Sequence, residues 1–325
     1  MAKTYKQLSV EERDRIALLK GQGLSVRGIA RALGRNEGTI SRELKRNSGQ
    51  VYANCYLAHR AQMRADQRKI RNHGLKRLAD PQLRAFIGRQ IRRGWSPERI
   101  AGRWRLLGRG QVSHEAIYQW IYSKAQQLAP LLPKAHRRRK RLGHSSKHKS
   151  FFIPSRNPVS QRPKWIDKRL QAGHWEADTI IGRHSLSALQ IAVERKTRFA
   201  RLNKLRGKFA EDMRRMLNRT LSQYPKHMRR TITYDNGREN VQHLLVNARL
   251  GTKSYFCEKM HSWEKGSVEN AAGLVRRHLP KRTDFATVSN EQVKRVERWL
   301  NSLPKKCLGF RTPAEAFRAS VALAG

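Results

Sequence analysis

The second half of the chain alternates segments of strand periodicity with segments of helix periodicity, and this alternation restricts the possible folds more than any other feature. Alternating or continuous apolar runs predict strands at 173–182, 187–205 (a pair turning near 194–197), 231–234 and 253–259. Helical periodicity predicts helices at 208–225, 240–251 and 267–279. Three strands, a helix, a strand, a helix, a strand and a helix indicate a mixed sheet with helices packed on it, an α/β layer.

Three acidic residues fall at particular places in this layer. The strand GHWEADTIIG carries Asp178, the segment TITYDNG places Asp235 at the end of a later strand, and Glu269 lies on a following helix. Hard divalent cations such as Mg²⁺ prefer oxygen ligands, and a pair of them stabilises the attacking and leaving oxygens of a phosphoryl transfer. Without metal, converging carboxylates would repel one another. The pattern therefore predicts Asp178, Asp235 and Glu269 as catalytic metal ligands.

Other polar residues accompany these acids. Glu176 shares a strand face with Asp178, because residues two apart on a strand point to the same side. We expect Glu176 to support the ligands, with direct metal ligation as the alternative. Asn236 and Gly237 are expected to form the turn that presents Asp235.

The charge of the chain indicates a polyanionic partner. It holds 70 Lys and Arg against 24 Asp and Glu, a formal net charge of +46, and 15 of the acids follow residue 164. Neutralising phosphates releases counterions, so nucleic acid is the expected partner and an anionic membrane surface the alternative. No apolar run approaches the ~20 residues of a spanning helix, and the first residues lack the apolar region of a signal peptide. Three distant cysteines without a CxxC pair indicate reduced thiols in a cytosolic setting and no zinc site.

Residues 1–47 have the pattern of a helix-turn-helix domain. Ser9 and Glu12 form a predicted capping box, and glycine turns separate three short helices. In the third helix Ile40 and Leu44 would face the core. The side chains on the opposite face would then meet the DNA major groove and its phosphates; they are Thr39, Arg42, Lys45 and Arg46. A plain three-helix domain with a solvated basic face is the alternative.

A second helix-turn-helix domain is predicted over residues 80–125. Its helices begin at Asp80-Pro81, at Ser96-Pro97 and at Ser113, each with a residue that caps helix N-termini. In its last helix Ile117 and Ile121 would pack inward. The residues that would face DNA are His114, Glu115, Tyr118 and Gln119, of which His114, Tyr118 and Gln119 are the candidate DNA-contacting residues. His114 could equally be an ordinary exposed or hydrogen-bonded histidine.

Two basic segments connect the domains. Residues 48–79 are predicted to be a basic helical linker, and residues 126–164 a basic linker whose densest part is HRRRKRLGHSSKHKS. This run has no apolar periodicity and would order on a phosphate backbone through Arg137, Arg138 and Arg139. The alternative is a solubilising segment.

These motifs together resemble one family. GHWEADTIIG, TYDNGREN and HSWEKGSVENAAGLVRRHLPKRTDF, with the closing LNSLPKKCLGFRTPAEAF, are similar to the catalytic domain of DDE transposases of the insertion sequence thirty (IS30-like) family. The segment YKQLSVEERDRIALLKGQGLSVRGIARALGRNEGTISRELKRN resembles the family's end-binding helix-turn-helix, and GWSPERIAGRW with VSHEAIYQWIY resembles its second. The resemblance covers nearly the whole chain. It implies a multidomain α plus α/β protein, in which two helix-turn-helix domains precede an RNase H-like (retroviral integrase-like) catalytic domain over residues 165–325.

The resemblance also assigns roles to residues. Asp178, Asp235 and Glu269 match the DDE triad, and the 33 residues between Asp235 and Glu269 resemble the family's spacing. Arg276 resembles the basic residue that such enzymes aim at the terminal phosphate, with an ordinary surface arginine as the alternative. The chain reads YDNG, VENAAG and NSLP where the family usually reads TDNG, NENTNG and NxRP. None of these departures removes a carboxylate, so they concern contacts with DNA ends more than catalysis.

The predicted function is that of a DNA transposase. The resemblance implies binding to the terminal inverted repeats of an insertion sequence, strand cleavage and strand transfer with two Mg²⁺ ions (or Mn²⁺) per active site, and a homodimer or higher oligomer on double-stranded DNA in the bacterial cytoplasm at the nucleoid. A DNA-binding regulator with an inactive nuclease domain and an RNase H-like endonuclease remain the alternatives. The motifs do not distinguish which helix-turn-helix binds the ends and which binds target DNA.

Overall fold

The computed structural model describes residues 7–47, 55–74, 78–133, 152–182, 187–258 and 261–322, without the side chains of 69–74, 262 and 263. These residues form two compact units, Met1–Ala79 and Asp80–Gly325, which are considered separately below. The predicted phosphate-binding residues Arg137, Arg138 and Arg139 lie outside the described residues. The predicted division into five segments stays a prediction.

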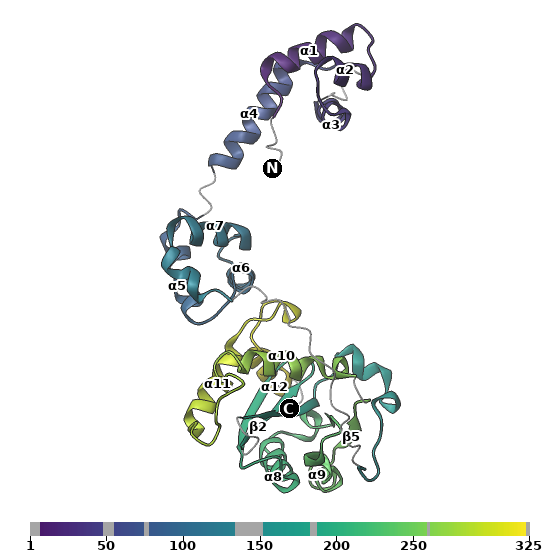
Figure 1. Cartoon of the computed structure of the whole chain (residues 1–325), viewed down its shortest axis with the longest axis vertical. Coiled ribbons are helices and arrows are strands. Elements are labelled where there is room, and N and C mark those ends of the chain that lie inside the picture. The colour runs from purple at the N-terminus through teal and green to yellow at the C-terminus, as the bar shows by residue number, and fades with distance from the viewer. Residues whose placement is uncertain are drawn as a thin grey trace. The chain divides into compact units, whose positions relative to one another are not determined.

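The first unit contains four helices, α1 (Val10–Gly21), α2 (Val26–Ala32), α3 (Glu37–Asn47) and α4 (Ala58–Gly74) (Figure 1). The capping box of Ser9 and Glu12 begins α1, as its sequence predicts. Ile16, Ile29 and Ile40 are fully buried in one core. Tyr56 and Ala61, at the start of α4, belong to that same core. The segment expected to be a linker therefore helps to hold the first helix-turn-helix together.

The second unit begins with α5 (Pro81–Arg92), α6 (Pro97–Leu106) and α7 (His114–Lys124). Asp80, Ser96 and Ser113 cap them, and each side chain accepts a hydrogen bond from a backbone N–H of the first turn. Ile117 and Ile121 are fully buried, as expected. The three helices have the predicted order and bounds of a second helix-turn-helix.

A five-stranded mixed sheet forms the centre of the same unit. Its strands are β1 (His174–Ile181), β2 (Ala188–Glu194), β3 (Ala200–Leu205), β4 (Thr231–Tyr234) and β5 (Lys253–Phe256). They lie in the order β3-β2-β1-β4-β5. The pairs β3–β2 and β2–β1 are antiparallel, and the pairs β1–β4 and β4–β5 are parallel. This is the predicted RNase H-like α/β domain, and it follows helix-turn-helix domains as expected.

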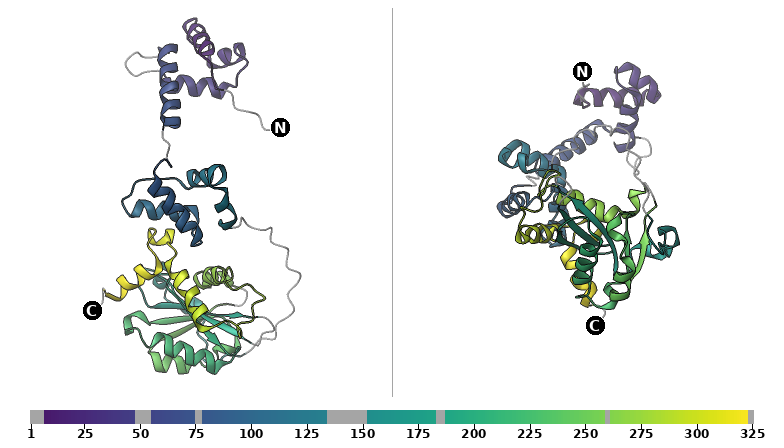
Figure 2. Two further views of the ribbon diagram at one scale, coloured as in Figure 1. Left: turned by 90° about the vertical axis from the view of Figure 1, so that its left-hand side faces the viewer. Right: turned by 60° about the horizontal axis from the view of Figure 1, so that its bottom comes forward.

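Helices cover both faces of this sheet (Figure 2). On one face lie α8 (Ala210–Leu221) and α9 (His243–Leu250), and on the other lie α10 (Gly266–Val275) and α11 (Asn290–Ser302). Trp175 and Ala177 of β1 pack into the core with Leu217 of α8 and Leu250 of α9. Because successive strand residues point to opposite faces, the intervening residues of β1 point toward α10.

The chain covers both edges of its own sheet. At the β3 edge, Ala200 N–H donates to Asn301 Oδ1 of α11 and the Asn301 amide donates back to Ala200 O, both at 2.8 Å. At the β5 edge, Phe256 N–H donates to Asn157 O at 2.8 Å. Asn157 belongs to the segment expected to be a linker, whose described residues 152–164 therefore pack on the α/β domain.

The second helix-turn-helix also contacts the C-terminal helices of its own unit. Arg103 of α6 makes a bidentate ion pair with Glu315 of α12 (Pro313–Ala322), at 2.6 and 2.8 Å. A Cβ added at Gly102 would overlap the ring of Phe310. The Trp299 indole N–H donates to Arg93 O at 2.8 Å. Charge, close packing and a hydrogen bond thus join α5 and α6 to the closing motif of the sequence.

None of the helices within the described ranges combines the length and the apolar character that a membrane span requires.

Candidate active site

Asp178 and Asp235 lie on neighbouring parallel strands. His174 pairs with Thr231 and Glu176 with Thr233, so the same register continued by two residues puts Asp178 level with Asp235. Partners in a parallel pair point to the same face, here the face covered by α10. The carboxylates predicted from two distant segments therefore meet on one face of the sheet, beside the carboxyl end of β4.

Lys265 lies between these two carboxylates. Its Nζ is 3.3 Å from Asp178 Oδ2 and 3.9 Å from Asp235 Oδ2, and its side chain is only 6% exposed. Burial raises the pKa of Asp178, and Lys265 offsets part of that rise. Burial alone would lower the pKa of Lys265, but the carboxylates of Asp178 and Asp235 raise it above its usual value. A single buried cation thus lies between two carboxylates and balances the charge of one of them.

Glu269 stands one helical turn beyond Lys265. It lies in the first turn of α10 and its side chain is exposed. Among the described residues, no three or more His, Cys, Asp or Glu side chains are grouped closely enough to hold a metal ion. The structure therefore brings together two of the three predicted ligands, and places the third on the adjoining helix without joining it to them.

Glu176 holds that helix to the strand of Asp178. Its carboxylate is completely buried, and its Oε2 accepts hydrogen bonds from Ser267 N–H and Val268 N–H of the first turn of α10, both at 2.9 Å. Its Oε1 pairs with Arg195 at 3.0 Å. Carboxylates favour helix N-termini because the free N–H groups and the helix dipole point there. Glu176 thus supports the site, as expected, and sets the position of the helix that carries Glu269.

Asp235 is fixed by its own loop. Asn240 Nδ2 donates to Asp235 Oδ1 at 2.7 Å, and Asn236 Nδ2 donates to Cys257 O at 2.8 Å. Gly237 lies close to the Glu239 side chain, where an added Cβ would overlap the carboxylate. The DNG turn therefore presents Asp235 at the end of β4.

Arg276 is anchored at the far end of α10. It follows the last helical residue, and its guanidinium donates to Ile181 O at 2.6 Å and to Pro280 O at 3.1 Å. The guanidinium also lies 5.7 Å from the centre of the Phe285 ring. Burial lowers the pKa of Arg276. Its predicted contact with a DNA phosphate stays a prediction.

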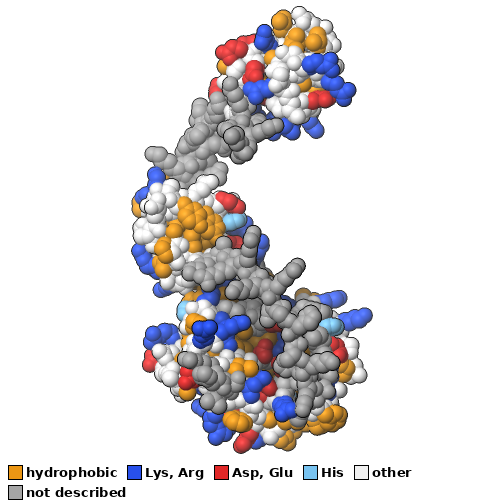
Figure 3. Space-filling view, in the orientation of Figure 1, with side chains coloured by type: hydrophobic (Ala, Val, Ile, Leu, Met, Phe, Trp, Pro, Cys, Tyr) orange, Lys and Arg blue, Asp and Glu red, His pale blue; other side chains and the backbone are white. Residues whose placement is uncertain are grey.

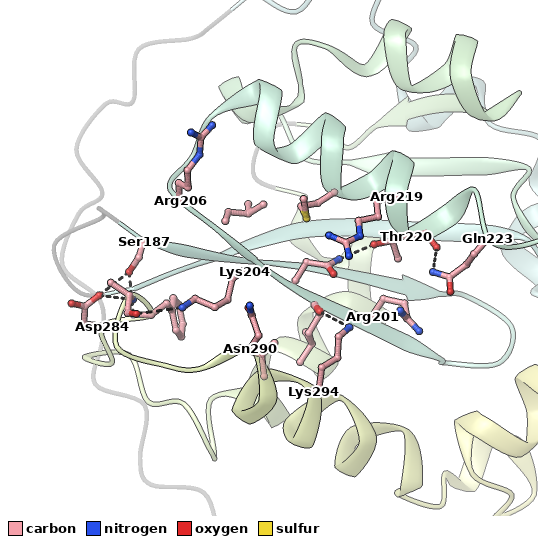
Figure 4. Close-up of a pocket in the computed structure, with 17 residues that line it drawn as sticks. Ser187, Arg201, Lys204, Arg206, Arg219, Thr220, Gln223, Asp284, Asn290 and Lys294 are labelled. Carbon is pink, nitrogen blue, oxygen red and sulfur yellow. Dashed lines mark hydrogen bonds between the residues drawn. The ribbon is translucent and has the colours of Figure 1, made fainter.

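A large pocket lies away from these carboxylates. It has a volume of about 990 Å³ and follows β3 between α8 and α11 (Figure 4). Its basic lining residues are Arg201, Lys204, Arg206, Arg219 and Lys294. None of Asp178, Asp235 and Glu269 lines it. The candidate site at Asp178 and Asp235 is therefore separate from this pocket.

The predicted DNA-contacting residues are accessible on both helix-turn-helix domains. On α3, Arg42, Lys45 and Arg46 are exposed and Thr39 is half-buried; on α7, His114 and Gln119 are exposed and Tyr118 is half-buried. Figure 3 shows Lys and Arg side chains spread over the visible face of both units. His114 Nε2 lies 2.9 Å from Glu115, which supports the reading of an ordinary hydrogen-bonded histidine.

Sequence reasoning missed Lys265 and the helix-capping contacts of Glu176. A signal for Lys265 exists in WEKGSVEN, where the lysine precedes Glu269 by four residues and so lies one helical turn before it. In a chain with 70 Lys and Arg, one more lysine does not stand out.

Comparison with known proteins gives consistent matches over the whole chain. A helix-turn-helix domain family matches residues 4–47. The transposase for insertion sequence element IS4351 of Bacteroides fragilis is 36% identical over 316 residues, covering 96% of each chain. The transposase InsI for element IS30A of Escherichia coli (strain K12) is 33% identical over 97% of this chain and 84% of its own. The transposase for element IS1086 of Cupriavidus metallidurans is 34% identical, over 96% and 94%.

Among solved structures, the catalytic core domain of BIV integrase is similar to 47% of this chain and 97% of its own, with a TM-score of 0.37 and 18% identity.

Proposed function

Because the chain belongs to the IS30 family of insertion-sequence transposases, we propose that it binds the terminal inverted repeats of an insertion sequence and catalyses Mg²⁺-dependent strand cleavage and strand transfer. Hydrolysis of one phosphodiester frees a 3′-hydroxyl, which then attacks a second phosphodiester and releases its leaving oxygen as a new hydroxyl. No covalent enzyme intermediate is needed.

The observation that carries the proposal is the convergence of Asp178 and Asp235 on one cation position. Two carboxylates at the same level of neighbouring strands, both within 4 Å of the Lys265 ammonium, form a donor pair for a positive charge. A regulator that only bound DNA would have no use for such a pair next to a helix that carries a third acid.

The chemistry of these donors fits a hard divalent cation. Membership of a transposase family implies a divalent metal, and carboxylate oxygens are the ligands that Mg²⁺ prefers. We assign Asp178, Asp235 and Glu269 as ligands of two Mg²⁺ ions, for which Mn²⁺ could substitute. Bound metal would supply charge stabilisation and an activated water for hydrolysis.

The chain's own residues position this chemistry. Glu176 fixes the first turn of α10 against β1, so Glu269 stays beside the strand of Asp178. Arg276 retains N–H donors beyond those used by Ile181 O and Pro280 O, because a guanidinium has five. We assign these free donors to the phosphate at the end of the element.

The helix-turn-helix domains would deliver the DNA. The first would bind element ends through the exposed face of α3, with Thr39, Arg42, Lys45 and Arg46 at the groove. The second would add His114, Tyr118 and Gln119 of α7, and Arg137, Arg138 and Arg139 would contact phosphates. Two DNA ends require more than one copy, so the working form would be a dimer or higher oligomer on double-stranded DNA in the bacterial cytoplasm.

Cleavage and joining of element ends test this proposal. Purified protein, Mg²⁺ and a labelled DNA that carries both ends should give nicked and then joined products. Asp235→Asn should abolish both products and leave end binding intact, because it removes a metal ligand outside the helix-turn-helix domains. The matched control is Glu211→Gln, an exposed carboxylate on α8.

The rival functions give different results. Tight end binding without cleavage, equal in the natural protein and the Asp235→Asn variant, would leave a DNA-binding regulator. Cleavage without any joined product would indicate an endonuclease.

A further inference from the structure

The described part of the chain contains one lysine within 4 Å of two carboxylates of the candidate triad. Lys265 is 5% exposed and reaches Asp178 and Asp235 with the same nitrogen. Buried lysines are rare unless they are paired, because burial of a charge costs free energy. Lys265 therefore differs from the many exposed lysines and arginines of this chain, because it is buried and paired with two carboxylates.

We propose that Lys265 is an internal counter-ion that occupies the cation position between Asp178 and Asp235 in the metal-free protein, and that a divalent cation displaces it. The inference rests on the proposed function, since it takes these two aspartates as metal ligands. It goes further by giving a role to a residue outside the triad.

Charge balance supports this role. Two carboxylates facing one another repel, and each favours a nearby positive charge. The Lys265 ammonium supplies one positive charge to two negative ones, so the metal-free site keeps a net negative charge that still attracts a cation. A divalent ion would balance both carboxylates. The ammonium and the metal compete for the same oxygens, so each weakens the binding of the other.

The backbone at Lys265 allows the exchange. Lys265 ends a 3₁₀ turn, Ser262–Lys265, and is the residue that immediately precedes α10, with φ −114° and ψ 34°. Because Lys265 lies outside α10, a change in its side-chain torsions requires no change in the hydrogen bonds of the helix. Glu176 keeps the first turn of α10 in place through Ser267 and Val268 whichever cation is present. The ammonium of Lys265 can therefore leave the carboxylates while the hydrogen bonds to Glu176 keep α10, with Glu269, in place.

Metal binding to the full-length protein without DNA tests the proposal. Mn²⁺ would be titrated by calorimetry into the natural protein, Lys265→Met and Lys265→Gln, with circular dichroism to establish that each is folded. Both variants should bind Mn²⁺ more tightly, by about tenfold or more, because no ammonium has to leave. Both should also melt at a lower temperature without metal, and Mn²⁺ should raise their melting temperature by more than it raises that of the natural protein.

A matched control separates this effect from the loss of any lysine. Lys294 pairs with the buried carboxylate of Glu297 at 3.2 Å on α11, outside the site. Lys294→Met should therefore leave Mn²⁺ affinity unchanged.

The possible results separate the counter-ion role of Lys265 from the proposed metal site. Unchanged or weaker Mn²⁺ binding in both Lys265 variants, with binding lost in Asp235→Asn, would overturn the counter-ion role and leave the metal site standing. Absence of Mn²⁺ binding in every protein, the natural one included, would overturn both. Tighter binding in the Lys265 variants that also requires Asp235 would establish the exchange.

Discussion

Glu176 and Asp178 are two residues apart on one face of β1, yet they serve different purposes. Glu176 is completely buried and uses both oxygens on protein donors, Arg195 and the first turn of α10. Asp178 is partly exposed, and its Oδ2 lies 3.3 Å from the Lys265 ammonium. The strand therefore carries a buried acid that holds the structure together and, two residues on, a partly exposed acid that we propose as a metal ligand.

Loss of Glu176 should damage both stability and chemistry. We expect Glu176→Ala to lower the free energy of unfolding by about 3–5 kcal/mol, because Arg195 keeps the half-exposed Asp167 but loses its fully buried carboxylate partner, and two N–H groups of α10 lose their acceptor. Cleavage should fall sharply because α10 loses its anchor, while end binding by the first helix-turn-helix should persist. Denaturant unfolding and a DNA-binding titration measure the two effects.

Glu211→Ala on the exposed face of α8 is the control for this prediction and should change stability little. Equal stability of the Glu176→Ala and Glu211→Ala proteins would show that the hydrogen bonds to α10 contribute nothing.

At the residue scale, the sequence singles out acids more readily than the groups around them. Asp178, Asp235 and Glu269 could be selected because acids are scarce in this chain and these fall on strands or on a following helix; their role as metal ligands stays a prediction. Lys265 could not be selected, since its role depends on a distance to residues 87 and 30 positions earlier that no local pattern encodes.

Elements were predictable where periodicity determines them. Strand and helix order, the N-caps at Asp80, Ser96 and Ser113, and the buried isoleucines of α7 all follow from local sequence. The pairing of β1 with β4 does not, because neither strand's sequence identifies a parallel partner 57 residues away. The packing of α4 on the first core was missed for the same reason.

The contact between α6 and the closing motif gives a prediction at the scale of elements. Gly102→Ala should destabilise the protein by about 1–3 kcal/mol, because the new methyl group would overlap the Phe310 ring and force the two segments apart. Cleavage should then become less accurate in position, since α7 and the carboxylates lose their fixed spacing. Thermal melting and sequencing of the cut ends provide the readouts.

Gly273 provides the comparison. It lies on α10 with open space around it, so the same substitution there should be neutral or stabilise the helix by about 0.5–1 kcal/mol. If Gly102→Ala and Gly273→Ala changed stability alike, close packing against Phe310 would not hold the two segments together.

The whole molecule is strongly basic, and that property should appear as salt dependence. Removal of the exposed cations of α3 in an Arg42→Ala, Lys45→Ala, Arg46→Ala variant should make the slope of log affinity for element ends against log salt shallower by roughly 2–3. Each lost phosphate contact releases one counterion fewer. Fluorescence anisotropy over a range of salt concentrations measures the slope.

Three exposed arginines on the C-terminal helices serve as the control, in an Arg295→Ala, Arg298→Ala, Arg318→Ala variant. This variant removes the same formal charge and should leave the slope almost unchanged. An equal loss of slope in both variants would mean that total charge, and not the face of α3, determines end binding.

The covered edges of the sheet determine how copies of this protein can meet. An open edge strand is a template on which a neighbour's backbone can add, which leads to strand exchange or to fibrous aggregates. Here Asn301 satisfies the backbone of Ala200 at one edge and Asn157 that of Phe256 at the other. The backbone at these positions is therefore not open for pairing with the sheet of a second copy. An oligomer of the kind proposed above would have to associate through helical surfaces or through the DNA itself.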